Sequence, residues 1–88
     1  MKTVWKFKLE VTDHQSVFLP VGSQVLTSEF QGNELFVWAL VDDQVATEDY
    51  QFRIVGTGHD ADGLEGWRYI NTVFYNNLVW HIFTEELL

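Results

Sequence analysis

Hydrophobic and polar residues alternate along several short segments of the chain. Residues 3–11 show this most clearly, because one face of the segment carries Trp5, Phe7, Leu9 and Val11. A period of two residues with one apolar face is typical of a half-buried β-strand. The opposite face carries Lys6 and Lys8, and we interpret it as an outer, solvated face.

Six further strands are expected from runs rich in β-branched and aromatic residues, at residues 17–19, 24–30, 35–41, 50–55, 67–75 and 78–83. Residues 35–41 are apolar on both faces, which favours a position in the middle of a sheet. The connection at 42–49 and the tail at 84–88 could each contain a helical turn. We predict one all-β domain over residues 1–88, a compact sandwich or partly open barrel of about seven short, mainly antiparallel strands.

Composition adds a surplus of aromatic rings to this picture. The 88 residues include seven Phe, four Trp and three Tyr but no cysteine. So many rings in so small a domain favour self-association, or a partner that covers an exposed apolar patch. We find no signal peptide and no apolar run long enough to span a bilayer, so a soluble cytoplasmic protein is expected.

The net charge of −8 disfavours binding to duplex nucleic acid, because that affinity depends on Lys and Arg neutralising phosphates. The acidic residues concentrate at 42–49 and 60–65. These carboxylates could form a face that mimics nucleic acid, although a simple solubility charge explains them as well.

The candidate site is the segment in which the strand at 50–55 runs into Gly56, Thr57, Gly58 and His59. Glycine permits positive φ angles or the close approach of another group, so this bend can present backbone N–H groups together with a hydroxyl and an imidazole. A ligand-contacting loop is one interpretation. The alternative is a bulge or turn whose polar side chains satisfy local backbone groups.

Cations and rings elsewhere in the chain could complete such a site. We assign ligand binding to Arg53, Arg68, Lys6, Lys8 and Trp67, in addition to residues 56–59. A few cations suffice to neutralise a small nucleotide, and tryptophan offers a stacking surface for a base. Rings at strand spacing are, however, more often part of a core.

No catalytic or metal motif is recognisable, and we predict a protein that is not an enzyme and has no cofactor. His81 lies in an apolar strand, and we favour a structural, hydrogen-bonded histidine over a catalytic one. The segment 60–65 lacks the ligands of a calcium loop, and no third ligand joins His59 and His81 in a metal site. No serine lies in a glycine-flanked elbow.

Six segments together resemble a family of small proteins encoded largely by bacteriophages and prophages, namely residues 2–7, 19–22, 37–42, 53–59, 69–73 and 78–83. The sequences Gly-Thr-Gly-His at 56–59 and Val-Trp-His at 79–81 are the most specific parts. The resemblance predicts glycine near Asn71 and glutamine near Phe74, so this chain departs from it at both positions. It implies a phage accessory protein that acts by binding in the cytoplasm of an infected bacterium.

Three functions follow as hypotheses. The first is sequestration of a small nucleotide-type signal of host defence, by a homo-oligomer with its site at residues 56–59. The second is inhibition of a host defence protein through the acidic loops or an aromatic face. The third is a structural or virion accessory role without a discrete site.

Overall fold

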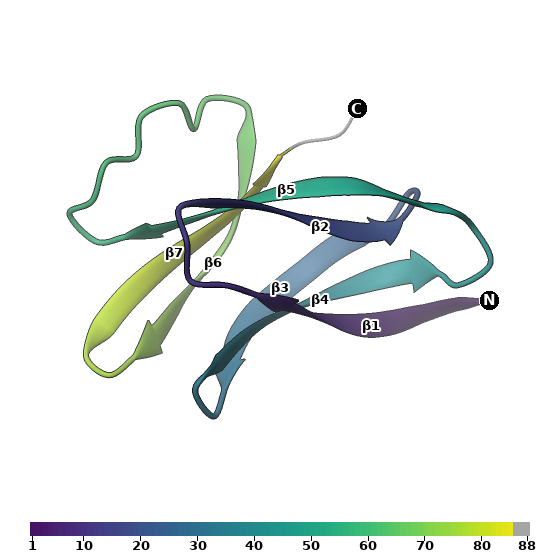
Figure 1. Ribbon diagram of the computed structural model, residues 1–88, viewed down its shortest axis with the longest axis horizontal. Coiled ribbons are helices and arrows are strands. Elements are labelled where there is room, and N and C mark those ends of the chain that lie inside the picture. The colour runs from purple at the N-terminus through teal and green to yellow at the C-terminus, as the bar shows by residue number, and fades with distance from the viewer. Residues whose placement is uncertain (86–88) are drawn as a thin grey trace.

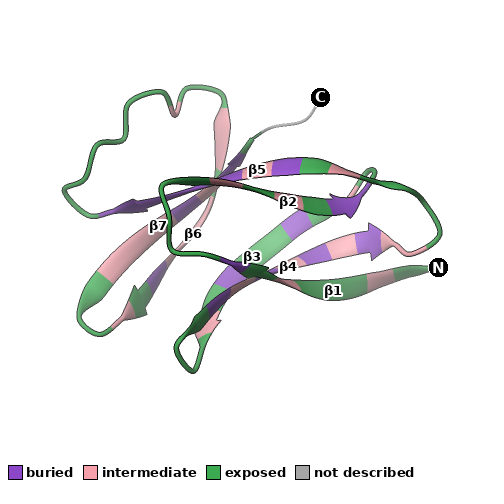
Figure 2. Ribbon diagram, viewed as in Figure 1, coloured by how far each residue is buried: buried purple, intermediate pink, exposed green. Residues whose placement is uncertain are grey.

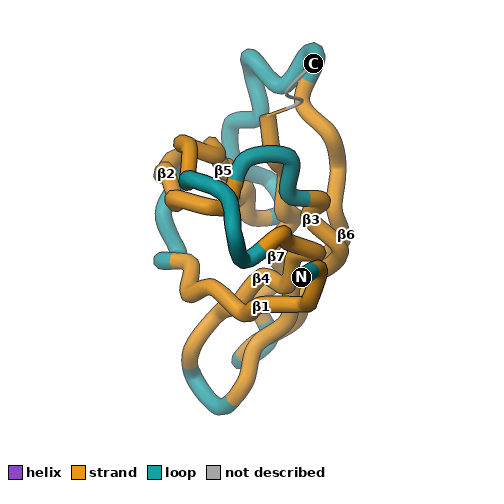
Figure 3. Tube along the Cα trace, turned by 90° about the vertical axis from the view of Figure 1, so that its right-hand side faces the viewer, coloured by secondary structure: helices purple, strands orange, loops and turns teal. Residues whose placement is uncertain are grey.

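The computed structural model describes residues 1–85, which form seven antiparallel strands in two sheets and contain no helix (Figures 1 and 3). The strands are β1 (Lys2–Leu9), β2 (His14–Pro20), β3 (Gln24–Gln31), β4 (Glu34–Asp42), β5 (Thr47–Gly56), β6 (Trp67–Tyr75) and β7 (Leu78–Glu85). The predicted all-β class is therefore confirmed. The sheets do not close into a barrel, and the fold is a sandwich.

The smaller sheet has the strand order β1-β4-β3, and the larger sheet has the order β2-β5-β7-β6. Strand β4 is central, as its two apolar faces predict. Strand β5 joins the two halves of the larger sheet, because its residues 47–53 pair with β2 and its residues 52–56 pair with β7. The site loop that follows β5 extends from this junction (Figure 1).

The core lies between the sheets, and its buried positions follow the period of two. On β4, Leu35, Val37, Ala39 and Val41 point inward, while Phe36, Trp38 and Leu40 lie half-buried on the outer side. Figure 2 shows the buried segments along β4, β5 and β7. The buried hydrophobic residues are Leu9, Leu19, Val25, Leu35, Val37, Ala39, Val41, Tyr50, Phe52, Ile54, Val55, Val73 and Ile82.

The sheets meet along one edge, where β3 contacts β6. Each of these strands carries a register irregularity at this edge, at Val25/Thr27 in β3 and at Tyr69/Asn71 in β6. The Asn71 side chain crosses the junction: its Oδ1 accepts from the Ser28 backbone N–H at 3.2 Å, and its Nδ2 donates to the Ser28 carbonyl at 2.8 Å. The Asn71 amide thus joins the edges of the two sheets by hydrogen bonds, as backbone hydrogen bonds join neighbouring strands within one sheet.

Three local expectations need correction. Strand β1 ends at Leu9, so Val11 lies in the following loop and is exposed. Trp5 is 41% exposed, because β1 is an edge strand with few contacts to β2. Residues 43–45 form a turn and residues 84 and 85 belong to β7, so neither predicted helical turn is present there. The remaining tail positions, 86–88, lie outside the described residues.

Candidate functional site

A continuous row of hydrogen-bonded side chains crosses the outer face of the larger sheet at the end of β5. The Thr57 hydroxyl lies 2.8 Å from Nε2 of His81, and the Thr72 hydroxyl lies 2.9 Å from Nδ1 of the same ring. The Tyr69 hydroxyl lies 2.6 Å from the Thr72 hydroxyl. Both imidazole nitrogens are therefore engaged, and the ring is fixed in orientation.

The strands explain why these four residues meet. Strands β6 and β7 are joined by Asn76 and Asn77, both with positive φ, and this two-residue turn places Thr72 opposite His81. Strand β5 pairs with β7 on the other side, and the pairing continues into the loop, where the Thr57 N–H donates to the Val79 carbonyl at 3.1 Å. The irregularity at Tyr69/Asn71 sets the tyrosine within reach of Thr72.

The row has a definite chemical capacity. A threonine hydroxyl can donate and accept, so either tautomer of the neutral imidazole is satisfied by Thr57 and Thr72. In some enzymes, a hydroxyl nucleophile lies beside an imidazole base that a third group orients, and the row has a similar spacing. Here the third group is a hydroxyl and not a carboxylate. The nearby N–H groups of Thr57 and His59 already donate to Val79 and Gly56 carbonyls, so neither is available to an oxyanion.

His59 leaves the same bend in a different direction from Thr57. Its ring packs edge-on against Trp80, with centroids 6.0 Å apart, and closes over Gly56. A Cβ atom at Gly56 would lie 2.8 Å from the imidazole, so this glycine is needed for close approach. Gly58, at φ +86°, is needed for its backbone conformation instead. His59 and Trp80 together line two shallow cavities, of about 420 and about 310 Å³.

Arg53 is a structural cation in this fold. Its side chain is 11% exposed, and Nη2 forms an ion pair with Asp13 at 3.0 Å. Nη1 donates to the Asp62 carbonyl at 2.8 Å. Arg53 therefore ties the loop between β1 and β2 to the loop between β5 and β6, and both of its terminal nitrogens are already engaged.

Trp67 lies at the start of β6, where its ring packs edge-on against His14 with centroids 5.6 Å apart. His14 in turn hydrogen-bonds the Gln51 side chain at 2.8 Å. The indole therefore covers polar side chains of β2 and β5, on the same sheet face as the His81 row.

The other predicted cations lie elsewhere. Arg68 points into the end of the sandwich and donates to the Val25 carbonyl at 2.8 Å. Lys6 and Lys8 lie on the outer face of the smaller sheet, where Lys6 sits 4.3 Å from the Phe36 ring centroid and Lys8 pairs with Glu34 at 3.3 Å. That carboxylate raises the pKa of Lys8. The structure thus places the four cations in three separate regions.

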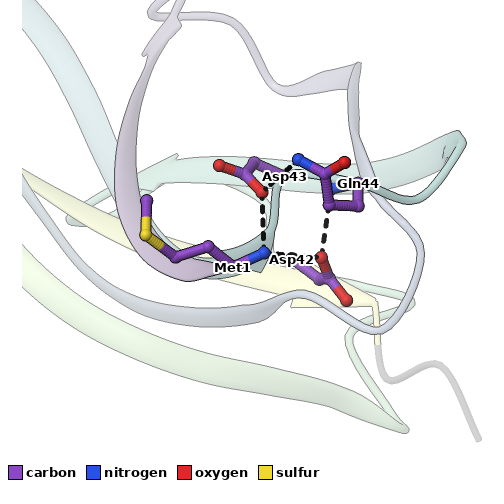
Figure 4. A network of polar contacts seen from close by, with 4 residues as sticks. All are labelled: Met1, Asp42, Asp43 and Gln44. Atoms are coloured by element: carbon purple, nitrogen blue, oxygen red, sulfur yellow. Dashed lines mark hydrogen bonds and ion pairs between the residues drawn. The ribbon is translucent and has the colours of Figure 1, made fainter.

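The acidic connection between β4 and β5 is partly neutralised within the molecule (Figure 4). The amino group of Met1 lies 2.9 Å from Asp43 and 3.6 Å from Asp42. Gln44 donates from its side chain to Asp43 and from its backbone to Asp42, both at 3.0 Å. The hydrogen bond to Asp43 raises the pKa of the amino group, and the bonds from Gln44 and the amino group lower the pKa of Asp43.

Exposed apolar side chains flank the His81 row. Tyr69 is 53% exposed and Phe74, two positions beyond Thr72 on the same strand, is 70% exposed. We call the surface formed by Thr57, Tyr69, Thr72, Phe74 and His81 the His81 face.

Sequence reasoning identified Thr57 and a hydrogen-bonded His81, but it did not connect the two residues and it missed Thr72 and Tyr69. The signal for Thr72 was present, since a two-residue turn at Asn76-Asn77 fixes which residues of β6 and β7 face one another. Tyr69 was hidden by the register irregularity, which changes the alternation that a sequence pattern would predict.

The chain matches the family described as "Domain of unknown function (DUF7352)" over residues 1–87, and it belongs to that family. No curated protein shows a significant match to it. Among solved structures, likewise, none matches significantly. Within the described residues, no helix is long and apolar enough to cross a membrane.

Proposed function

We propose that the protein is a binding module that recognises a partner protein through the His81 face. One observation carries the proposal: two largely exposed aromatic rings, Tyr69 and Phe74, flank a hydrogen-bonded polar row on a rigid sheet. Aromatic anchors contribute much of the affinity in protein interfaces, and fixed polar groups among them provide direction.

The charge around the His81 face indicates the chemistry of the partner. The loop between β5 and β6 carries Asp60, Asp62 and Glu65, all of them exposed. A partner with an apolar patch and a basic rim would match both the rings and these carboxylates. The predicted roles of the acidic loop at 60–65 and of the aromatic face would therefore combine in one surface.

The small-nucleotide hypothesis draws less support from the geometry. A phosphate site needs several cations that converge, whereas Arg53, Arg68 and the two lysines lie apart and Arg53 already holds Asp13. The resemblance implies action against host defence, so the partner would then be a host defence protein. Self-association is the other form that binding by this face could take.

The test is affinity capture from cells in which the protein naturally occurs, comparing Tyr69→Ala/Phe74→Ala with Phe18→Ala. Phe18 is 64% exposed on β2, at the opposite edge of the same sheet, and so it is a matched control. We expect the double variant to lose a partner that the wild type and Phe18→Ala both retain. Loss in both variants, or in neither, contradicts the proposal.

Two parallel measurements separate the alternatives. Sedimentation of the purified protein shows whether the partner is a second copy. A thermal-shift screen with cyclic mononucleotides and dinucleotides tests the nucleotide hypothesis. A saturable shift that survives the Tyr69/Phe74 change would favour that hypothesis over ours.

A further inference from the structure

One end of the sandwich holds charged residues at positions that alternation assigns to the core. On β5, alternation places Glu48 on the same side of the strand as the buried Tyr50, Phe52 and Ile54. Across from it, Arg68 is paired with the buried Thr84, on the inner side of β6. Glu48, Arg68 and Thr84 line a cavity of about 610 Å³ between the β2–β3 turn and the ends of β5, β6 and β7. Ligand cavities are typically about 300–1,000 Å³.

Opposite charges line this cavity without pairing. Arg68 and two glutamates, Glu48 and Glu85, all contribute to its wall, yet no ion pair within 4.0 Å joins Arg68 to either carboxylate. The Arg68 guanidinium is held in place by its hydrogen bond to the Val25 carbonyl. Since a guanidinium has five N–H donors, most of its capacity remains for a ligand.

A tyrosine adds a directional group to the wall. The Tyr50 hydroxyl donates to the Ser23 carbonyl at 3.3 Å. Burial first, and then the negative charge of Glu48, raise the pKa of Tyr50. The hydroxyl therefore stays protonated at neutral pH, next to the carboxylate of Glu48.

From this arrangement we infer that the cavity is a binding site for a small basic amino acid. The guanidinium of Arg68 accommodates the ligand carboxylate, and Glu48 and Glu85 accommodate its two cationic groups. One cation and two anions in the wall are complemented by one anion and two cations in the ligand. The negative net charge of the protein also favours a cationic ligand. The site is separate from the His81 face and does not depend on the proposed function.

The probe is L-lysine, compared with two molecules that each lack one of its charges. Norleucine lacks the side-chain ammonium, and cadaverine lacks the carboxylate. We expect saturable NMR shifts at Tyr50, Arg68 and Val25 with L-lysine, and at least about tenfold weaker binding of the other two, as the loss of one charged hydrogen bond predicts. Equal binding of all three, or no saturable shift with lysine, overturns the inference.

Two variants test the roles of the wall residues. Glu85→Gln is expected to weaken lysine binding about tenfold and leave norleucine unaffected, because it removes the negative charge that pairs with the side-chain ammonium. Glu65→Gln, at an exposed glutamate outside the cavity, is the control and should change neither. Arg68→Gln should weaken lysine and norleucine alike but not cadaverine. A thermal melt of each variant shows whether it folds, and identical behaviour of Glu85→Gln and Glu65→Gln contradicts the proposed site.

Discussion

Asn71 and Ser28 join the two sheets through a pair of hydrogen bonds between a side-chain amide and a backbone peptide. Ser28 is 1% exposed, so its backbone groups at this junction have little access to water. The family resemblance also predicts a glycine near this position. Asn71 is therefore a residue whose contribution to stability can be isolated.

We predict that Asn71→Gly lowers the free energy of unfolding by about 2–4 kcal/mol, because it leaves buried polar groups of Ser28 without partners and loosens the strand. Asn77→Gly is the matched control. Asn77 has a φ of 63°, which glycine adopts without strain, so the same substitution should be neutral or stabilising there. Urea denaturation measures both, and equal costs would contradict the role given to Asn71.

Thr72 lies in the middle of the His81 row and Thr57 lies at its end. The two threonines should therefore contribute differently to the free energy of unfolding. Thr72→Val releases both the Tyr69 hydroxyl and Nδ1 of His81, and we expect a cost of about 1–2 kcal/mol. Thr57→Val releases one bond at an exposed position, and its cost should stay below about 0.5 kcal/mol. Denaturation gives the two costs, and the ¹⁵N shifts of His81 report whether its ring has changed partners. The reverse order of costs would show that the row is not held at its centre.

Gly56 and Gly58 are needed for different reasons, and a double-mutant cycle with His59 separates them. Gly56→Ala brings a methyl group against the His59 and Trp80 rings, whereas Gly58→Ala forces positive φ on alanine. Each should cost about 1–2 kcal/mol. Adding His59→Ala should recover part of the cost at Gly56 and none at Gly58. Chemical denaturation of the five variants completes the cycle, and equal coupling at both glycines would disprove this distinction.

Arg53 should contribute more to the free energy of unfolding than its ion-pair partner, Asp13. Arg53→Met removes hydrogen bonds to two loops from a nearly buried position, and we expect a loss of about 1.5–3 kcal/mol. Asp13 is 69% exposed, so Asp13→Asn should cost less than about 1 kcal/mol. Hydrogen exchange should show faster opening of the loop at 57–66 in Arg53→Met alone. Unchanged exchange would mean that Arg53 does not restrain this loop.

The contact between Met1 and Asp43 predicts two limits in pH. The pKa of the amino group is raised from 8.0, so its contribution is complete below pH 8 and disappears as the pH rises through the folded-state value. The pKa of Asp43 is lowered from 3.8, so its contribution is present above that pH and disappears in more acidic solution. Asp43→Asn should flatten both parts of the stability curve. Asp49→Asn, an exposed carboxylate in the same region, should leave them unchanged, and a curve unaltered by Asp43→Asn contradicts the assignment.

The elements of this fold were accessible from sequence because they depend on local pattern. The alternation in residues 3–9, the two apolar faces of β4 and the Asn76-Asn77 turn each reflect a constraint within one strand or hairpin. Which strands belong to which sheet was not accessible. It depends on which distant strands pair, and β5 pairs with both β2 and β7.

The candidate site divides along the same line. The segment 56–59 was identified because glycines and polar residues are adjacent in sequence. The contact of His59 with Trp80 and that of Thr57 with His81 were not predicted. His59 turns toward Trp80, while Thr57 meets His81. The cations were grouped by charge alone, whereas the structure pairs Arg53 with Asp13 and turns Arg68 to the inner side of the sheet, where it donates to the Val25 carbonyl. Pairing across sheets decides such outcomes.

The position of the last strand has a consequence for synthesis of the protein. Strand β7 lies between β5 and β6, so the larger sheet has no continuous ladder until residues 78–85 have left the ribosome. The pair β2–β5 and the strand β6 must wait until then, with their apolar faces uncovered. We therefore expect a chain truncated before residue 78 to aggregate and not to form a smaller folded domain.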